Sequence, residues 1–96
     1  MRRRLASAID AAREAADSDR LCTLRLIKAA IDDRERELRA SDEEREGLGE
    51  VDISAILATM LRQREESVRN YEESGRLELA EQERREAEII REFLPR

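Results

Sequence analysis

The stretch QREESVRNYEESGRLELAEQERREAEIIREFLP, residues 63–95, predicts two helices joined by a short turn. Apolar residues recur every three or four positions on both sides of Gly75, which places them on one face of each helix. Glycine closes a helix at low conformational cost because it accepts a positive φ. Pro95 cannot continue a helix, so the second helix should end before it. A turn this short makes the two helices antiparallel neighbours.

An antiparallel hairpin centred on Gly75 pairs residues that lie at equal distances from the turn. Arg64 then falls opposite Glu86 and within one helical turn of Glu83, so we predict an ion pair on a partly buried seam. The alternative is that Arg64 extends into water, but a partly buried guanidinium favours a fixed carboxylate partner.

Two further helices are predicted before residue 41. Apolar residues share one face of the first, namely Leu5, Ala8, Ile9, Ala12 and Ala16. The second spans residues 19–40, about 30 Å at the usual rise per residue, with its face formed by Leu21, Leu24, Ile27, Ile31 and Leu38. Between the two helices, Asp17-Ser18-Asp19 supplies oxygens that can cap free backbone amides.

Residues 41–52, SDEEREGLGEVD, predict a loop because they contain two glycines and a cluster of acids. Asp52 or Ser54 is expected to cap a third helix, whose apolar face begins at Ile53 and ends towards Gly75. The sequence therefore predicts an all-α fold of four helices in a single domain over residues 1–96. The long second helix should pack on the antiparallel hairpin of the third and fourth.

The net charge of −5 is unevenly distributed, since residues 1–40 carry +2 and residues 41–96 carry −7. Nucleic-acid binding requires a basic surface, so any RNA contact is expected in the first half. The candidate RNA or partner surface there comprises Arg13, Arg20, Arg25 and Lys28. Nearby Asp17, Asp19 and Asp32 can neutralise this surface locally, and no aromatic residue is interleaved for base stacking.

Arg76 is a further candidate because it lies at the start of the last helix. A cation is unfavourable beside the positive end of a helix unless a carboxylate offsets it. Glu72, Glu73 and Glu78 are the expected partners.

The chain has no histidine, one cysteine and no glycine-rich phosphate loop, so we predict no catalytic, cofactor-binding or metal-binding residue. Cys22 flanks the apolar face of the second helix and is expected to be a small packing residue. A carboxylate metal enzyme built on Glu83 and Glu86 is the weaker alternative, because such helical bundles usually add histidine ligands. One cysteine and no long apolar run favour a cytoplasmic protein without a membrane partner.

Several short pieces of sequence follow one another along the chain in an informative order and spacing: Asp19-Arg20-Leu21, Leu24-Arg25, Lys28-Ala29-Ala30-Ile31, Gln63-Arg64, Ser67, Gly75-Arg76, Leu79-Ala80, Glu83, Glu88-Ile89 and Leu94-Pro95. By their order and spacing, the chain resembles the GatB/YqeY family. The signature residues expected to have structural roles are Gln63, Arg64, Ser67, Gly75, Glu83, Glu88, Leu94 and Pro95.

This resemblance implies a non-catalytic, cytoplasmic helical module related to the tail of transfer RNA-dependent amidotransferase, without a cofactor. The amidotransferase label, a carbon–nitrogen ligase with glutamine as amido donor, would describe lineage. The implied partner is transfer RNA or a protein of the translation machinery. Resembling proteins continue into a tail subdomain past the position of Leu94-Pro95, and we expect this chain to match the amino-terminal subdomain and to lack that tail.

The alternative function is a protein-interaction or self-assembling helical module with no RNA role. Aromatic residues make up only 2% of the chain, so the core must consist mainly of Leu, Ile and Ala and should be modest. A modest core leaves apolar surface that a homo-oligomer could cover.

Overall fold

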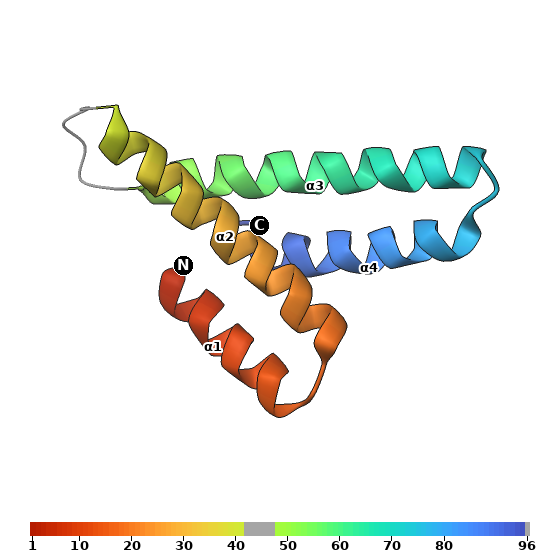
Figure 1. The fold of residues 1–96 in the computed structure, drawn as a ribbon, viewed down its shortest axis with the longest axis horizontal. Coiled ribbons are helices and arrows are strands. Elements are labelled where there is room, and N and C mark those ends of the chain that lie inside the picture. The colour runs from red at the N-terminus through yellow and green to blue at the C-terminus, as the bar shows by residue number, and fades with distance from the viewer. Residues whose placement is uncertain (42–47, 96) are drawn as a thin grey trace.

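The computed structural model describes residues 1–41 and 48–95, and these residues form four helices. They are α1 (Arg2–Glu14), α2 (Ser18–Ala40), α3 (Glu50–Glu73) and α4 (Leu77–Glu92). α1 and α2 form one hairpin, α3 and α4 form a second, and α2 crosses the second hairpin (Figure 1). The described residues contain no strand, and the predicted all-α fold with a long second helix packed on a hairpin is confirmed.

The core lies where α1 and α2 meet the beginning of α3 and the end of α4. Its residues come from all four helices and are Leu5, Ile9, Ala12, Leu24, Ile27, Ile31, Ile53, Leu57, Ile90 and Phe93. These positions match the predicted apolar faces. Ala16, which was expected on the first of these faces, is instead exposed and follows the end of α1. Leu77, the first residue of α4, is also 67% exposed at the tip of the second hairpin.

The turn between α1 and α2 depends on backbone hydrogen bonds around Ala16. The N–H of Asp17 donates to the carbonyl of Ala12 at 3.0 Å, and the N–H of Ala16 donates to the carbonyl of Arg13 at 3.1 Å. This pattern is a Schellman motif, which requires a left-handed residue, and Ala16 has a φ of 55°. The Asp17 carboxylate then accepts from the N–H of Arg20 at 3.2 Å and caps α2, as predicted.

The turn between α3 and α4 repeats this motif with glycine in the left-handed position. The N–H of Arg76 donates to the carbonyl of Tyr71 at 2.8 Å, and the N–H of Gly75 donates to the carbonyl of Glu72 at 3.1 Å. Gly75 has a φ of 76°. The prediction that glycine closes this helix is confirmed. α4 ends at Glu92, three residues before Pro95.

α3 begins one turn earlier than the sequence predicted. Its first residue is Glu50, preceded by Gly49, and the Asp52 carboxylate accepts from the N–H of Gly49 at 3.0 Å. The prediction of Asp52 or Ser54 as the capping residue is therefore wrong, because the Asp52 side chain reaches back from the third position of the helix. Residues 42–47 of the predicted loop lie outside the described residues.

The molecule is elongated, with extents of 48 × 32 × 25 Å and a radius of gyration of 14.9 Å. A compact domain of this length would have a radius of gyration of about 12.5 Å. The extra length arises from the far half of the α3–α4 hairpin, which extends beyond α2 (Figure 1).

Candidate interaction surfaces

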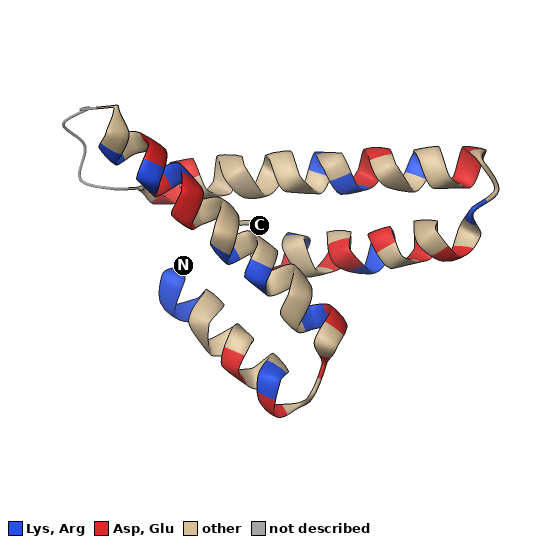
Figure 2. Ribbon diagram, viewed as in Figure 1, with Lys and Arg blue, Asp and Glu red and all other residues tan. Residues whose placement is uncertain are grey.

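The basic residues predicted around the α1–α2 junction are mostly engaged in ion pairs. Arg13 pairs with Asp10 at 3.2 Å, Arg20 with Glu92 at 2.6 Å, and Lys28 with Asp32 at 2.7 Å. Arg25 is exposed and has no ion pair with a described residue. Figure 2 shows the resulting mixture of basic and acidic bands along α1 and α2. Arg25 is therefore the cation of this set that remains available for a partner without breaking an existing contact.

Arg2 and Asp32 join the start of α1 to the middle of α2. The Arg2 guanidinium contacts Asp32 at 3.0 Å and Glu35 at 2.8 Å. Hydrogen bonds donated by Lys28 and Arg2 hold the pKa of Asp32 below its ordinary value, and the hydrogen bonds that Arg2 donates to Glu35 and Asp32 raise the pKa of Arg2. Lys28 thus belongs to a cluster that positions α1, which limits its freedom to contact RNA.

A second cluster fixes α1 and α2 to the end of α4. Arg4 donates to the backbone carbonyl of Glu92, and its guanidinium lies 4.8 Å from the centre of the Phe93 ring. Arg20 pairs with the Glu92 carboxylate. A cation at the carboxyl end of a helix is also stabilised by the helix dipole. Arg20 therefore has a structural role in addition to any contact with a partner.

Arg76 lies at the tip of the α3–α4 hairpin and does not join the basic residues of the α1–α2 junction (Figure 1). The structure pairs Glu72 with Arg84 at 3.1 Å and gives Arg76 no ion pair within the described part of the chain. The expected pairing of Arg76 with Glu72, Glu73 or Glu78 is therefore wrong. In the turn, the backbone N–H of Arg76 closes the Schellman motif, and the side chain of Arg76 is exposed to solvent.

Arg64 pairs with both predicted carboxylates across the hairpin. Its Nη1 lies 3.4 Å from Glu83, and its Nε lies 3.3 Å from Glu86. The three side chains are 26%, 16% and 20% exposed respectively, so the predicted ion pair on a partly buried seam is confirmed. Desolvation by burial, opposed by Arg64 and reinforced by the neighbouring Glu86, raises the pKa of Glu83 above its ordinary value.

The remaining signature residues surround this seam or follow it. Ser67 is half-buried on α3, one turn beyond Gln63, which is exposed. Glu88 is exposed and pairs with Arg91. Leu94 packs partly buried against the core, whereas Pro95 is exposed.

Cys22 is exposed, so its expected role as a packing residue is wrong. It lies on the side of α2 beside α4, where it lines a small hollow with Gln82 and Arg85. The fully buried neighbour is Thr23, whose hydroxyl donates to the carbonyl of Asp19 at 3.2 Å and thereby satisfies its polar group. Within residues 1–41 and 48–95, no group of three or more His, Cys, Asp or Glu side chains is arranged to hold a metal ion.

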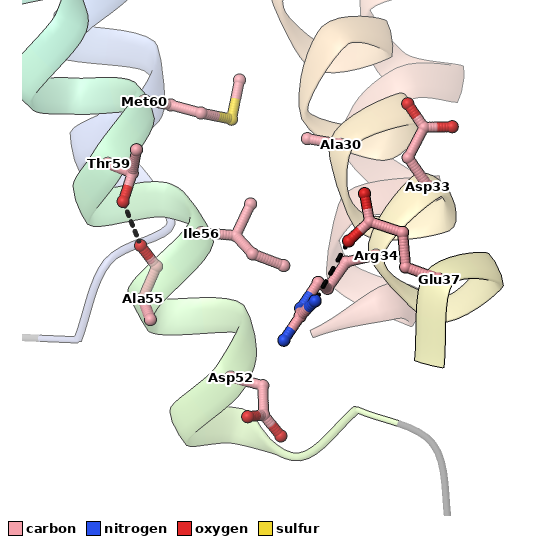
Figure 3. Close-up of a pocket in the computed structure, with 9 residues that line it drawn as sticks. All are labelled: Ala30, Asp33, Arg34, Glu37, Asp52, Ala55, Ile56, Thr59 and Met60. Carbon is pink, nitrogen blue, oxygen red and sulfur yellow. Dashed lines mark hydrogen bonds and ion pairs between the residues drawn. The ribbon is translucent and has the colours of Figure 1, made fainter. Parts of the chain in front are cut away.

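An open groove of about 410 Å³ separates the second half of α2 from the first half of α3. Figure 3 shows Ile56 and Met60 of α3 extending towards α2, with charged side chains at the edges. The lining residues are Ala30, Asp33, Arg34, Glu37, Asp52, Ala55, Ile56, Thr59 and Met60. This groove could not be predicted from the sequence, because Ile56 and Met60 have the spacing of core residues and periodicity alone does not show which face of α3 lacks a neighbour.

Comparison with protein-family models gives a match over nearly the whole chain. A protein-family model described as Yqey-like protein matches residues 2–96, which include all four helices and every signature residue. None of the curated proteins matches the chain. Among the described helices, none is long and apolar enough to cross a membrane.

Proposed function

The chain belongs to the YqeY-like protein family, which is related to the carboxy-terminal region of GatB, and from this premise we propose that it is a non-catalytic module that binds RNA. The proposed partner is transfer RNA, contacted in the cytoplasm by the α1–α2 junction. The observation that supports this surface most directly is Arg25, exposed and without an ion pair to a described residue, one turn from Lys28.

A non-catalytic role is supported by the chemistry of the side chains. The chain has no histidine to act as a general base near neutral pH, and its one cysteine is exposed on a helix surface. Glu83 and Glu86 are partly buried carboxylates, and both pair with Arg64. Binding is therefore the activity that these residues support best.

The test is an electrophoretic shift assay with transfer RNA at low and physiological salt. Replacing Arg25 with glutamine should weaken binding and lower the slope of log K against log salt by about one, because each lysine or arginine that contacts a phosphate contributes about one. The matched control replaces Arg62, which is exposed on α3, with glutamine and should leave binding unchanged. Absence of a shift at both salt concentrations would remove RNA as the partner.

The second candidate function is protein interaction or self-association, and the open groove between α2 and α3 favours it. Sedimentation of the isolated chain separates the two forms of this alternative. Concentration-dependent dimers would support self-association, whereas a strict monomer would leave a different protein as the partner.

A further inference from the structure

The far half of α3, residues 62–73, carries charged side chains that divide into two groups. One group pairs with α4 across the hairpin: Arg64 with Glu83 and Glu86, Glu65 with Arg91, and Glu72 with Arg84. The other group is exposed, has no ion pair with a described residue, and consists of Arg62, Glu66, Arg69 and Glu73. These residues follow one another at steps of four, three and four, so they share one face of the helix, here called the outer ridge of α3.

The signs of the outer ridge alternate along the helix, and Figure 2 shows basic and acidic bands alternating along this half of α3. Arg62 and Glu66 lie four residues apart, as do Arg69 and Glu73, and neither pair forms an ion pair in the structure. In both pairs the cation precedes the anion, which is the less favourable order beside the helix dipole. The charges of the outer ridge therefore stay available for a partner, and they sum to zero.

An antiparallel copy of α3 matches this pattern at every position. When two outer ridges face each other across a two-fold axis, Arg62 lies opposite Glu73 of the second copy, and Glu66 lies opposite its Arg69. The symmetry repeats each contact, so every charge of the ridge meets an opposite charge. A parallel copy would instead place arginine against arginine, and an RNA backbone would meet both carboxylates.

The far half of the hairpin also has surface for a partner to cover. The chain exposes 6873 Å², whereas a compact monomer of this mass would expose roughly 5,700 Å². The hairpin that extends beyond α2 accounts for this elongation (Figure 1). The surplus of about 1,200 Å² exceeds the roughly 600 Å² per partner that a small, weak interface buries.

We propose that the chain forms a weak antiparallel dimer in which the outer ridges of two copies pair. Exposed ion pairs each contribute little, so the dissociation constant should be about 0.1–1 mM and should rise with added salt. The outer ridge lies on α3, apart from Arg25, and the dimer does not depend on the RNA-binding proposal. At the lower protein concentrations of an RNA shift assay the chain is monomeric, so Arg62 remains a suitable control there.

Two exchanges of charge within the outer ridge provide the test, because both keep the composition and the net charge of the chain. Arg69→Glu with Glu73→Arg gives the sign order positive, negative, negative, positive, which places like charges opposite each other in the antiparallel dimer. Glu66→Arg with Arg69→Glu gives positive, positive, negative, negative, which keeps opposite charges opposite. Sedimentation equilibrium compares them at low salt and chain concentrations up to about 1 mM, with a reductant because Cys22 is exposed.

The wild-type chain and the Glu66→Arg, Arg69→Glu variant should dimerise with similar dissociation constants, whereas Arg69→Glu with Glu73→Arg should raise the constant by at least about tenfold. Circular dichroism checks that the variants fold. Inversion of all the signs of the ridge also retains the complementarity, and it replaces the second exchange if that variant does not fold. The proposal is overturned if the wild-type chain stays monomeric under these conditions, if both exchanges have the same effect, or if only the second exchange abolishes the dimer.

Discussion

At the residue scale, Ala16 and Gly75 occupy equivalent positions in two Schellman motifs but differ in side chain. Both have a positive φ, and a Cβ atom in this conformation costs about 1–2 kcal/mol. Ala16→Gly should therefore stabilise the fold by about 0.5–1 kcal/mol, while Gly75→Ala should destabilise it by about 1 kcal/mol. Urea unfolding followed by circular dichroism measures both values. No atom lies within 4 Å of a Cβ built at Gly75, so the cost there comes from the backbone alone.

Ala15→Gly is the matched control for this pair. Ala15 caps α1 with a helical φ of −78°, so glycine there should lower stability through the entropy of the unfolded chain. If Ala16→Gly were as destabilising as Ala15→Gly, the left-handed conformation of Ala16 would be contradicted.

Glu83 is the second residue with a testable energetic role. Its pKa is raised in the fold, so the folded state binds its proton more tightly than the unfolded state, where the ordinary value is 4.5. The stability that Glu83 contributes is thus fully present below pH 4.5 and is lost as the pH rises through the raised pKa. Glu83→Gln, which resembles the protonated form, should raise the unfolding midpoint at pH 7. Its advantage over the wild-type chain should disappear as the pH approaches 4.5.

Glu81→Gln serves as the control, because Glu81 is exposed and pairs with Arg84 on the same helix. It should bring no gain at pH 7. Lower stability of Glu83→Gln than wild type at pH 7 would mean that attraction to Arg64 outweighs the desolvation of the carboxylate.

Ion-pair partners that follow from helical register could be predicted from the sequence. The exposure of a side chain beside an apolar stripe and the backbone conformation of a residue could not. Arg64 could be paired with Glu83 and Glu86 because a short turn fixes the alignment of both helices. Ala16 was placed on an apolar face, since alanine gives no sign that it adopts a left-handed φ. The sequence predicts Cys22 as a packing residue, yet it is exposed, because a residue beside an apolar stripe can face either the core or solvent.

At the element scale, the Arg64 seam divides the α3–α4 hairpin into two halves of different packing. Towards the core, α3 buries Ile53 and Leu57, and α4 buries Ala87 and Ile90. Towards the tip, the one buried residue of α3 and α4 is Ala80. The boundary between these halves could not be predicted, since apolar spacing continues through Val68 and Tyr71 although α2 does not reach them.

Native-state hydrogen exchange should reveal this division. Amides of residues 66–72 and 80–84 should exchange through local openings that cost less free energy than those of residues 55–61 and 88–91, because few apolar contacts stabilise the far half. Arg64→Met should widen the difference by leaving two partly buried carboxylates without their cation. Equal opening free energies along the whole hairpin would show that it unfolds as one unit.

At the scale of the whole molecule, four helices with few aromatic side chains form a small core at one end and an extended hairpin at the other. The all-α class and the order of helices followed from periodicity. The angle between the two hairpins did not, because it depends on how α2 crosses α3 and α4, and this crossing also creates the open groove.

Small-angle scattering tests this shape directly. The monomer should give a radius of gyration close to the 14.9 Å of the structure, plus the contribution of the hydration layer, and well above the roughly 12.5 Å of a compact domain. A radius near the compact value would mean that the far half of the hairpin folds back over α2. Such a radius would contradict the crossing of the two hairpins, in which the far half of α3 and α4 extends beyond α2.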